Sequence, residues 1–362
     1  MDTPVRIASR LPDVGVSIFA VMTRLANEHG AINLSQGFPD FACDPQLVEA
    51  VHRHMVAGHN QYAPMPGLPA LQQAVADHQK RFYGIDYDPA EEVTIHAGAT
   101  EALCSTLAAL LDRGDEAIVF EPFYDSYRPG IALALAKAKV VPLAPPEFRL
   151  DPAALAAAVG PKTRLLVLNS PNNPAGRVFS REELEGMAAL CVERDLLVVT
   201  DEVYEHIVFD GAHVPIASLP GMRERTVTIS SAGKTFSLTG WKVGWSCAPP
   251  DLAAAVRAAH QFATFAVATP FQHAVVTALG AGDDYYARLT AEYLVRRNRL
   301  CDGLADVGFA VRPPEGTYFA LADIRPLGYD DGVTFCRTLV ERVGVAAIPA
   351  SAFAAGKRLN HL

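Results

Sequence analysis

Hydrophobic positions in the middle of the chain alternate between short continuous runs and segments with helical spacing. Continuous runs are typical of strands that are buried on both faces, as in a parallel sheet covered by helices. The runs predict strands at Ala117–Phe120, Val140–Leu143, Arg164–Asn169, Leu196–Asp201, Thr226–Ser230 and Val243–Ala248. The helical spacing predicts helices at Thr100–Leu111, Ser180–Arg194 and Leu252–Phe265. This alternation indicates an α/β fold with a mostly parallel sheet.

Other helices and a second unit follow from composition and from a change of pattern. Ser180 and Glu183 form a capping-box signature, and alanine favours helices at Leu133–Ala138 and Ala153–Ala158. A different series of elements begins after about residue 280, with Asp284–Asp306, Phe309–Arg312, Gly316–Ala322, Val333–Val343 and Val345–Ile348. We expect a large sheet domain over residues 46–280 and a smaller α+β domain over residues 281–362. Residues 1–45 should pack on the small domain.

Composition narrows the function classes. The 362 residues are 50% hydrophobic and 20% charged, which is ordinary for a globular protein. The net charge of -9, without a long basic run, argues against nucleic-acid binding. No apolar stretch approaches the roughly 20 residues of a membrane span, and the first ten residues lack a signal-peptide core, so we expect a cytoplasmic protein. The six cysteines form no CxxC pair, so we expect reduced thiols.

Lys234 lies just after a predicted strand, in the segment Ser230–Thr235 (SSAGKT), and three kinds of chemistry compete for it. A phosphate-binding P-loop also ends in Gly-Lys-Thr, but it requires a glycine where Thr228 stands. Ser231 and Lys234 match the S-x-x-K motif of serine acyl enzymes, but the companion S-D-N and K-T-G motifs are missing from the sequence. The surrounding residues favour the third interpretation, a Schiff-base lysine that binds a carbonyl cofactor.

Pyridoxal phosphate is the carbonyl cofactor that other segments are suited to hold. Its ring nitrogen must stay protonated, which requires a buried carboxylate, and Asp201 ends a predicted strand. Tyr204 follows three residues later and could reach the ring hydroxyl. Taken alone, Asp201 could equally be the N-cap of a following helix.

The sequence also offers residues that could bind the phosphate of the cofactor and contact the face of its ring. Gly98–Thr100 precedes a predicted helix, and a helix N-terminus after glycine binds anions. Ser231 and Lys242 could add a hydroxyl and a positive charge. Tyr124 could stack on the ring, and Asn173, in a rigid turn, could donate to an oxygen anion. Ordinary turns and aromatic core packing are the structural alternatives, so the joint occurrence of these residues in this order carries the interpretation.

Together these segments resemble the class I aminotransferases of pyridoxal-phosphate fold type I, and within them the methionine and kynurenine aminotransferase group. The resemblance runs from about residue 10 to about residue 353. The matching segments are Ile32–Phe41 (INLSQGFPDF), Asn60–Gly67 (NQYAPMPG), Ala97–Leu103 (AGATEAL), Glu121–Tyr127 (EPFYDSY), Ser170–Gly176 (SPNNPAG), Asp201–His206 (DEVYEH), Ser231–Trp245 (SAGKTFSLTGWKVGW), Glu315–Phe319 (EGTYF) and Val345–Phe353 (VAAIPASAF).

The resemblance implies a role for each residue at a motif position. Lys234 would form the Schiff base and shuttle protons, and Asp201 would pair with the pyridinium nitrogen. Tyr204 and Asn173 would donate to the ring oxygen, and Tyr124 would stack on the ring. Ala99, Thr100, Ser231 and Lys242 would bind the phosphate. Gly37 would line the substrate pocket, and Tyr62 would contact the phosphate of the neighbouring subunit. A homodimer with shared active sites follows from the role of Tyr62.

The implied reaction is ping-pong transamination between an L-amino acid and a 2-oxo acid. Phe19, Tyr62 and Tyr124 would make the pocket apolar, which suits methionine-like or aromatic substrates. A carbon–sulfur β-lyase is an alternative, because it would use Lys234 and Asp201 in the same way. A second alternative is a protein that binds pyridoxal phosphate but catalyses little reaction.

The last residues of the sequence depart from the family pattern. Relatives carry an arginine shortly after the segment that matches Ala350–Phe353, followed by a further helix, and this arginine grips the substrate carboxylate at two points. The present sequence has no matching arginine before Leu362, and we expect Arg358 to be a surface residue. On this reading the cofactor binds and transamination is weak, because a charged two-point contact is missing.

Overall fold

A computed structural model describes residue 11 and residues 15–362. Within this part of the chain, seven strands form one sheet in the order β2-β8-β7-β6-β5-β3-β4. They are β2 (Val93–His96), β3 (Glu116–Glu121), β4 (Lys137–Pro142), β5 (Thr163–Asn169), β6 (Leu197–Asp201), β7 (Thr226–Ser231) and β8 (Gly244–Cys247). β8 runs antiparallel to both neighbours, and the other pairs are parallel. The predicted mostly parallel sheet is therefore confirmed, and the carboxyl ends of six strands meet at one edge.

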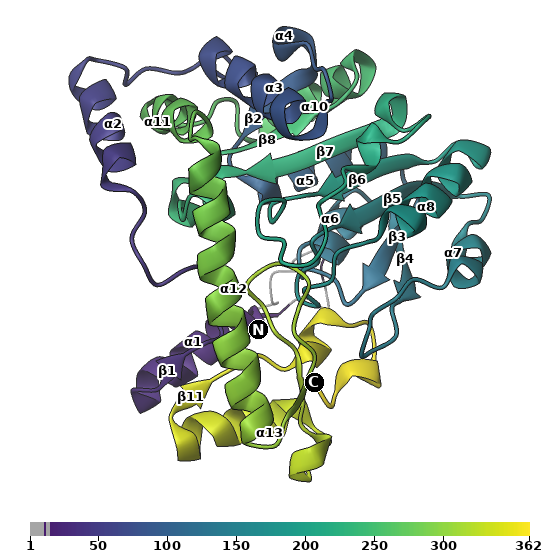
Figure 1. Ribbon diagram of the computed structural model, residues 1–362. Coiled ribbons are helices and arrows are strands. Elements are labelled where there is room, and N and C mark those ends of the chain that lie inside the picture. Colours follow the sequence, from purple (N-terminus) through teal and green to yellow (C-terminus); the bar gives the residue numbers. More distant parts are fainter. Residues whose placement is uncertain (1–10, 12–14) are drawn as a thin grey trace, which may run out of the picture.

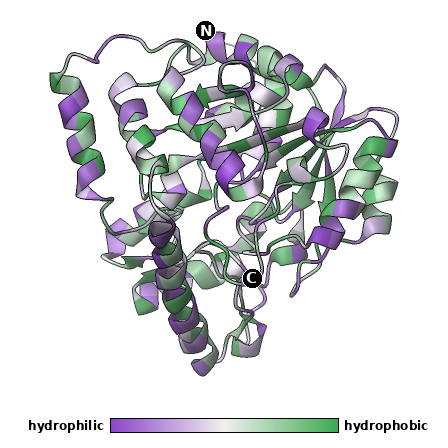
Figure 2. Ribbon diagram, turned by 45° about the horizontal axis from the view of Figure 1, so that its top comes forward, coloured by the Kyte–Doolittle hydropathy of each residue, from purple (hydrophilic) through white to green (hydrophobic). Residues whose placement is uncertain are grey.

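Alternate residues of the central strands enter two different hydrophobic clusters. Leu165 and Val167 of β5 pack with α5 (Ala99–Leu110), whereas Leu166 and Leu168 pack with α8 (Arg181–Glu193) on the other face. Each buried side chain of this size contributes roughly 1.5–3 kcal/mol relative to an exposed one. The hydrophobic strands lie between helices whose outer surfaces are more hydrophilic (Figure 2). This two-sided burial explains the continuous apolar runs in the sequence.

Helices cover both faces of the sheet (Figure 1). Besides α5 and α8 they are α2 (Pro45–Val56), α3 (Pro69–Tyr83), α4 (Pro89–Glu92), α6 (Tyr127–Leu133), α7 (Pro152–Ala158), α9 (Ala232–Thr235), α10 (Pro250–Ala263) and α11 (Thr269–Leu279). The capping box predicted for α8 is present, because the Ser180 side chain accepts from the Glu183 N–H and the Glu183 side chain accepts from the Ser180 N–H. No helix in the described residues is long and apolar enough to cross a membrane.

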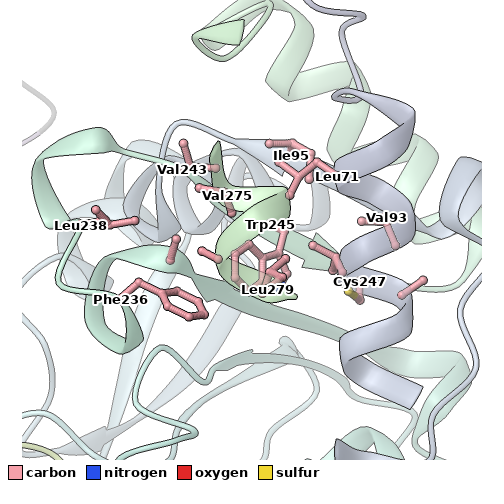
Figure 3. Packing of buried hydrophobic residues seen from close by; sticks show 14 of the residues in the cluster. Leu71, Val93, Ile95, Phe236, Leu238, Val243, Trp245, Cys247, Val275 and Leu279 are labelled. Carbon is pink, nitrogen blue, oxygen red and sulfur yellow. The ribbon is translucent and has the colours of Figure 1, made fainter. Parts of the chain in front are cut away.

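A third hydrophobic cluster fixes the β2–β8 end of the sheet. Trp245 of β8 packs with Ile95 of β2, Leu71 of α3 and Val275 of α11 (Figure 3). All four side chains are almost completely buried. The chain leaves β2 toward Gly98 and enters β8 from the side of Lys242, so this cluster holds both segments in place.

A smaller unit lies beside the sheet (Figure 1). It contains α12 (Asp283–Asp306), β9 (Ala310–Val311), β10 (Ala322–Asp323), α13 (Gly332–Thr338) and β11 (Val345–Ala346). β1 (Ile32–Asn33) pairs in parallel with β11, and α1 (Ile18–His29) packs Met22 and Ala26 against Cys336 and Val340. Residues near the N-terminus thus contact residues near the C-terminus. The exact domain boundaries at residues 45 and 280 stay a prediction.

The helix predicted over Leu133–Ala138 is wrong. α6 ends at Leu133, Leu135 has a φ of 64°, and β4 begins at Lys137. Ala138 pairs with Ala117 of β3, so strand pairing at the sheet edge overrides the helix preference of alanine.

Two further differences concern short segments. The element predicted over Gly316–Ala322 is wrong apart from Ala322, which begins β10. Thr317 has a φ of 66°, which interrupts an extended strand at this point. β2 was not predicted; its four residues alternate polar and apolar side chains (Val93, Thr94, Ile95, His96) and so form no continuous apolar run.

Candidate active site

Three neighbouring strands place polar side chains at the carboxyl edge of the sheet. β5 ends at Asn169, β6 at Asp201 and β7 at Ser231, and Asn169 lies directly beside Asp201 across the ladder. All three residues line one cavity of about 410 Å³. Ligands of parallel α/β folds bind beyond the carboxyl ends of the strands. This cavity is therefore the candidate active site.

Almost all of the residues proposed from the sequence meet in this cavity. Its lining includes Gly37, Ala99, Thr100, Tyr124, Asn173, Asp201, Tyr204, Ser231, Lys234 and Lys242. Tyr62 does not line it. The Tyr62 side chain is 82% exposed and lies edge-on to Phe265, with ring centroids 5.3 Å apart. Arg358 is exposed, as predicted.

Lys234 lies in α9, the single helical turn that follows β7. Its Nζ donates to the carbonyl oxygen of Gly37 at 2.7 Å and to the hydroxyl oxygen of Tyr318 at 3.0 Å. Burial lowers the Lys234 pKa, Asp201 opposes this effect and the positive charge of Lys242 adds to it, and the net result is a pKa of about 8. A buried amine that loses its proton this readily is a suitable nucleophile and proton carrier.

Asp201 is a buried carboxylate at the floor of the cavity. Its Oδ2 accepts a hydrogen bond from the hydroxyl of Tyr127 at 2.8 Å, and its Oδ1 accepts from the N–H of Val203 at 3.4 Å. Burial nevertheless raises the Asp201 pKa to about 6. No described residue forms an ion pair with it. The site thus offers a desolvated negative charge to a cationic ligand group.

The start of α5 forms a narrow cradle at one end of the cavity. Gly98, its N-cap, has a φ of 80°, a conformation that favours glycine. A Cβ added to Gly98 would lie 3.0 Å from Lys242 Nζ, and one added to Gly244 would lie 2.8 Å from the Ala99 nitrogen. The close approach of backbone N–H groups and an ammonium at a helix N-terminus suits an anion such as phosphate.

A buried polar network anchors this helix start from behind. Glu101 accepts from the Ala97 N–H at 3.0 Å, and its carboxylate lies 2.9 Å from His96 Nδ1 and 3.1 Å from His260 Nδ1. Burial raises the Glu101 pKa, but the two histidines outweigh it and hold the pKa well below its usual range. The network therefore fixes the first turn of α5 relative to β2 and α10.

Aromatic and amide groups complete the cavity walls. The Tyr204 ring lies edge-on to Tyr318, with centroids 5.3 Å apart, and burial holds the Tyr204 pKa well above 10. Tyr124 lies edge-on to Tyr127 at 5.7 Å. The backbone N–H of Asn173 donates to Asn169 Oδ1 at 2.7 Å, and the buried Oδ1 of Asn173 has no hydrogen-bond partner among the described residues.

Two residues at the site were missed from the sequence, Tyr127 and Tyr318. Tyr127 contacts Asp201, as described, and the Tyr318 hydroxyl donates to the carbonyl oxygen of Gly37 while accepting from Lys234. Both lie inside motif segments, EPFYDSY and EGTYF, so the sequence could have marked them as candidate site residues. The sequence could not show which groups their hydroxyls contact, because the direction of a side chain depends on the folded backbone.

Nearly the whole chain matches a known family. The model for aminotransferase class I and II matches residues 29–360. The chain belongs to this family. A relative from Mycobacterium tuberculosis, named "Probable N-succinyldiaminopimelate aminotransferase", is 50% identical over 95% of this chain and 88% of the relative. The methionine aminotransferase of Escherichia coli is 43% identical over 98% of this chain and 92% of its own length. The solved N-succinyldiaminopimelate aminotransferase of Mycobacterium tuberculosis has a TM-score of 0.96 at 48% identity, covering 98% of this chain and 94% of that one.

This aminotransferase has the fold type I architecture, and its cofactor is pyridoxal phosphate, as predicted. The relatives are transaminases, which favours transamination over the β-lyase and the binding protein with little catalysis. The described residues fit the cofactor. Within the described residues the carboxylate of Asp201 has no ion-pair partner, and the Gly98 cradle leaves room where a Cβ would intrude.

Proposed function

We propose that the cavity around Lys234 transfers the amino group of a methionine-like or aromatic L-amino acid to a 2-oxo acid. The observation that supports this substrate class is the cavity wall, which Phe19, Phe38 and Phe319 line beside Lys234. Apolar and aromatic walls favour a substrate with an apolar side chain. Among the relatives, the methionine aminotransferase of Escherichia coli bears a name that agrees with such a substrate.

The chemical work divides between two residues. When bound, pyridoxal phosphate supplies an aromatic ring that accepts the electron pair left behind when the substrate Cα loses its proton. Lys234 attaches the cofactor and moves that proton, because burial makes its amine neutral at a lower pH than an ordinary lysine. Asp201 holds the ring nitrogen in its protonated form, since a buried carboxylate without an ion-pair partner is most stable beside a positive charge.

The remaining residues position the cofactor. Tyr204 keeps its phenolic proton, because its pKa is raised, so its hydroxyl and the Asn173 amide would each donate a hydrogen bond to the ring oxygen. Tyr124 would stack on the ring. The phosphate would be held by the backbone of Ala99 and Thr100 at the start of α5, the Ser231 hydroxyl and the Lys242 ammonium. Gly37 lines the substrate side, where its carbonyl accepts from Lys234.

A second candidate substrate is N-succinyldiaminopimelate. Relatives bearing this name are 48–50% identical to the chain, a closer match than the methionine aminotransferase at 43%. The two candidates differ in the part of the substrate that faces the aromatic wall, which is apolar in one and a polar amide with a carboxylate in the other.

A half-reaction screen decides between them. The purified cofactor-loaded protein is mixed with methionine, phenylalanine or N-succinyldiaminopimelate, and the visible spectrum of the cofactor is followed over time. We expect the fastest change with methionine or phenylalanine. A faster change with N-succinyldiaminopimelate would support the second candidate, and no change with any of them would overturn the proposed substrate class.

We also infer a homodimer whose subunits share their active sites. Tyr62 is 82% exposed and lies outside the cavity of its own chain, and the apolar side chain of Phe262 at the same edge is 87% exposed. A tyrosine that reaches the phosphate of a second copy would be exposed in this way. Light scattering should give twice the mass of one chain, and Tyr62→Phe should weaken pyridoxal phosphate binding roughly 10-fold or more, as the loss of a hydrogen bond to a charged group implies. A monomer that binds the cofactor normally would contradict this inference.

The cytoplasm remains our proposed compartment. All six cysteines are free, and four of them are buried, which agrees with a reducing environment.

A further inference from the structure

Three histidines form a cluster at the edge of the sheet domain where α2 and α11 lie side by side (Figure 1). His54 belongs to the last turn of α2, His59 follows that helix, and His273 lies in α11. Each offers one ring nitrogen, and these nitrogens all lie within 4.8 Å of one another. None of the three lines the cavity around Lys234. We call this group the histidine cluster.

The rings of the cluster are unusually close for groups that can all carry positive charge. His54 Nδ1 lies 2.8 Å from His59 Nδ1, so one of these nitrogens accepts a hydrogen bond from the other. His54 stacks on His273 with centroids 4.1 Å apart and planes 3° apart, and His59 lies 4.5 Å from His273. No carboxylate of the described residues forms an ion pair with any of them.

A metal ion binds an imidazole through the lone pair of a ring nitrogen that carries no proton. The cluster brings three such rings together at the surface of the sheet domain.

We propose that His54, His59 and His273 form a site for one transition metal ion of the Zn²⁺ type. Three imidazole nitrogens are an established donor set for Zn²⁺, and the fourth position of a tetrahedral ion is open to water. Because a metal ion lies in the plane of the imidazole that binds it, His54 and His273 must turn out of their parallel stack to reach the same ion. His59 is exposed and the other two are partly exposed, so an ion has direct access from solvent. All three ligands come from one chain, so the site is complete without a second copy.

Two other groups of potential ligands are weaker candidates. His96, Glu101 and His260 are already hydrogen-bonded to one another, and the second nitrogen of His96 is paired with Ser246. In the group of His78, Glu205 and His206, the Glu205 carboxylate accepts from Tyr83 and Ser230, and the histidines are largely enclosed. Most polar atoms of these two groups have structural partners, although His78 Nδ1 has none among the described residues. The rings of the histidine cluster contact one another and are open to solvent.

Occupation of the site would join two helices and the turn between α2 and Tyr62. The ion would hold His59, three residues before Tyr62, against α11. We therefore expect metal binding to stabilise the segment around residues 57–62 against local unfolding, without adding a group to the catalytic cavity.

The test is a calorimetric titration of the cofactor-loaded protein with ZnCl₂. The expected result is one ion per chain. His59→Ala and His273→Ala should each weaken binding by about 100-fold or more, because loss of a second-shell partner alone costs about 10–100-fold. His52→Ala is the matched control, since His52 is an exposed histidine of α2 outside the cluster, and it should leave the affinity unchanged.

A second measurement keeps the test independent of folding. One equivalent of ZnCl₂ should raise the thermal midpoint of the parent protein and of His52→Ala, but not that of His59→Ala or His273→Ala. The proposal is overturned if the parent protein binds no Zn²⁺, if both cluster variants retain its affinity, or if His52→Ala loses as much affinity as they do.

Discussion

Removing the Tyr127 hydroxyl should shift the pH dependence of the enzyme through Asp201. Tyr127→Phe deletes the hydrogen bond that Asp201 Oδ2 accepts at 2.8 Å, while the ring stays in place. A hydrogen bond to a charged group contributes about 1.5–3 kcal/mol, and one pKa unit corresponds to about 1.4 kcal/mol, so the Asp201 pKa should rise by roughly 1–2 units. Its starting value is already raised to about 6 by burial.

The sign of the effect follows from the form of Asp201 that accepts the bond. The donor stabilises the ionised carboxylate, so its loss favours the protonated form at higher pH. The acidic limb of the kcat/KM profile should therefore move to higher pH by roughly 1–2 units, and kcat/KM at pH 7 should fall by roughly 2- to 10-fold. Steady-state kinetics between about pH 5 and pH 9 would measure both changes.

Tyr286→Phe is the matched control for this experiment. Tyr286 is also a buried tyrosine, but its hydroxyl has no hydrogen-bond partner and it does not line the cavity. Its substitution should leave the acidic limb in place. An unshifted limb in Tyr127→Phe, or an equal shift in Tyr286→Phe, would refute the assignment of Tyr127 as the positioning residue for Asp201.

Two further predictions concern the cradle and the lysine. Gly244→Ala should weaken pyridoxal phosphate binding roughly 10-fold or more, because its Cβ would lie 2.8 Å from the Ala99 nitrogen and overpacking costs about 1–3 kcal/mol. Gly240→Ala, with no atom within 4 Å, should bind normally, and equal dissociation constants for the two variants would argue against the cradle. The rate at which cofactor-free protein combines with pyridoxal phosphate should rise with pH and level off above about 8, since Lys234 reacts as the neutral amine and its pKa is lowered to about 8. A rate that keeps rising to about pH 10 would indicate an ordinary lysine.

The sequence was most informative where a physical constraint acts on many neighbouring residues. Two-sided burial imposes continuous apolar runs, and these runs located β3, β5, β6, β7 and β8 to within a residue or two. A different argument, the helix preference of alanine, failed at Leu133–Ala138, because the pairing of β4 with β3 decides the conformation from Lys137 onward. Local helix preference carries no information about such a distant partner.

The candidate site shows the same division. Asp201 and Ser231 end strands and Lys234 lies in the helical turn after β7, so the topology of a parallel sheet brings them together. Tyr127 and Tyr318 were not foreseen, because their roles depend on where a hydroxyl points after folding. Tyr62 does not meet the others within one chain, and its role in a second copy stays a prediction.

The central claim is that Lys234 carries the cofactor, and chemical trapping tests it most directly. The cofactor-loaded protein is reduced with borohydride, which makes the bond between lysine and cofactor permanent, and is then digested and mapped by mass spectrometry. The cofactor mass should lie on Lys234, and Lys234→Ala should carry none. The cofactor mass on Lys242, or on any other lysine of the unmodified chain, would contradict the account.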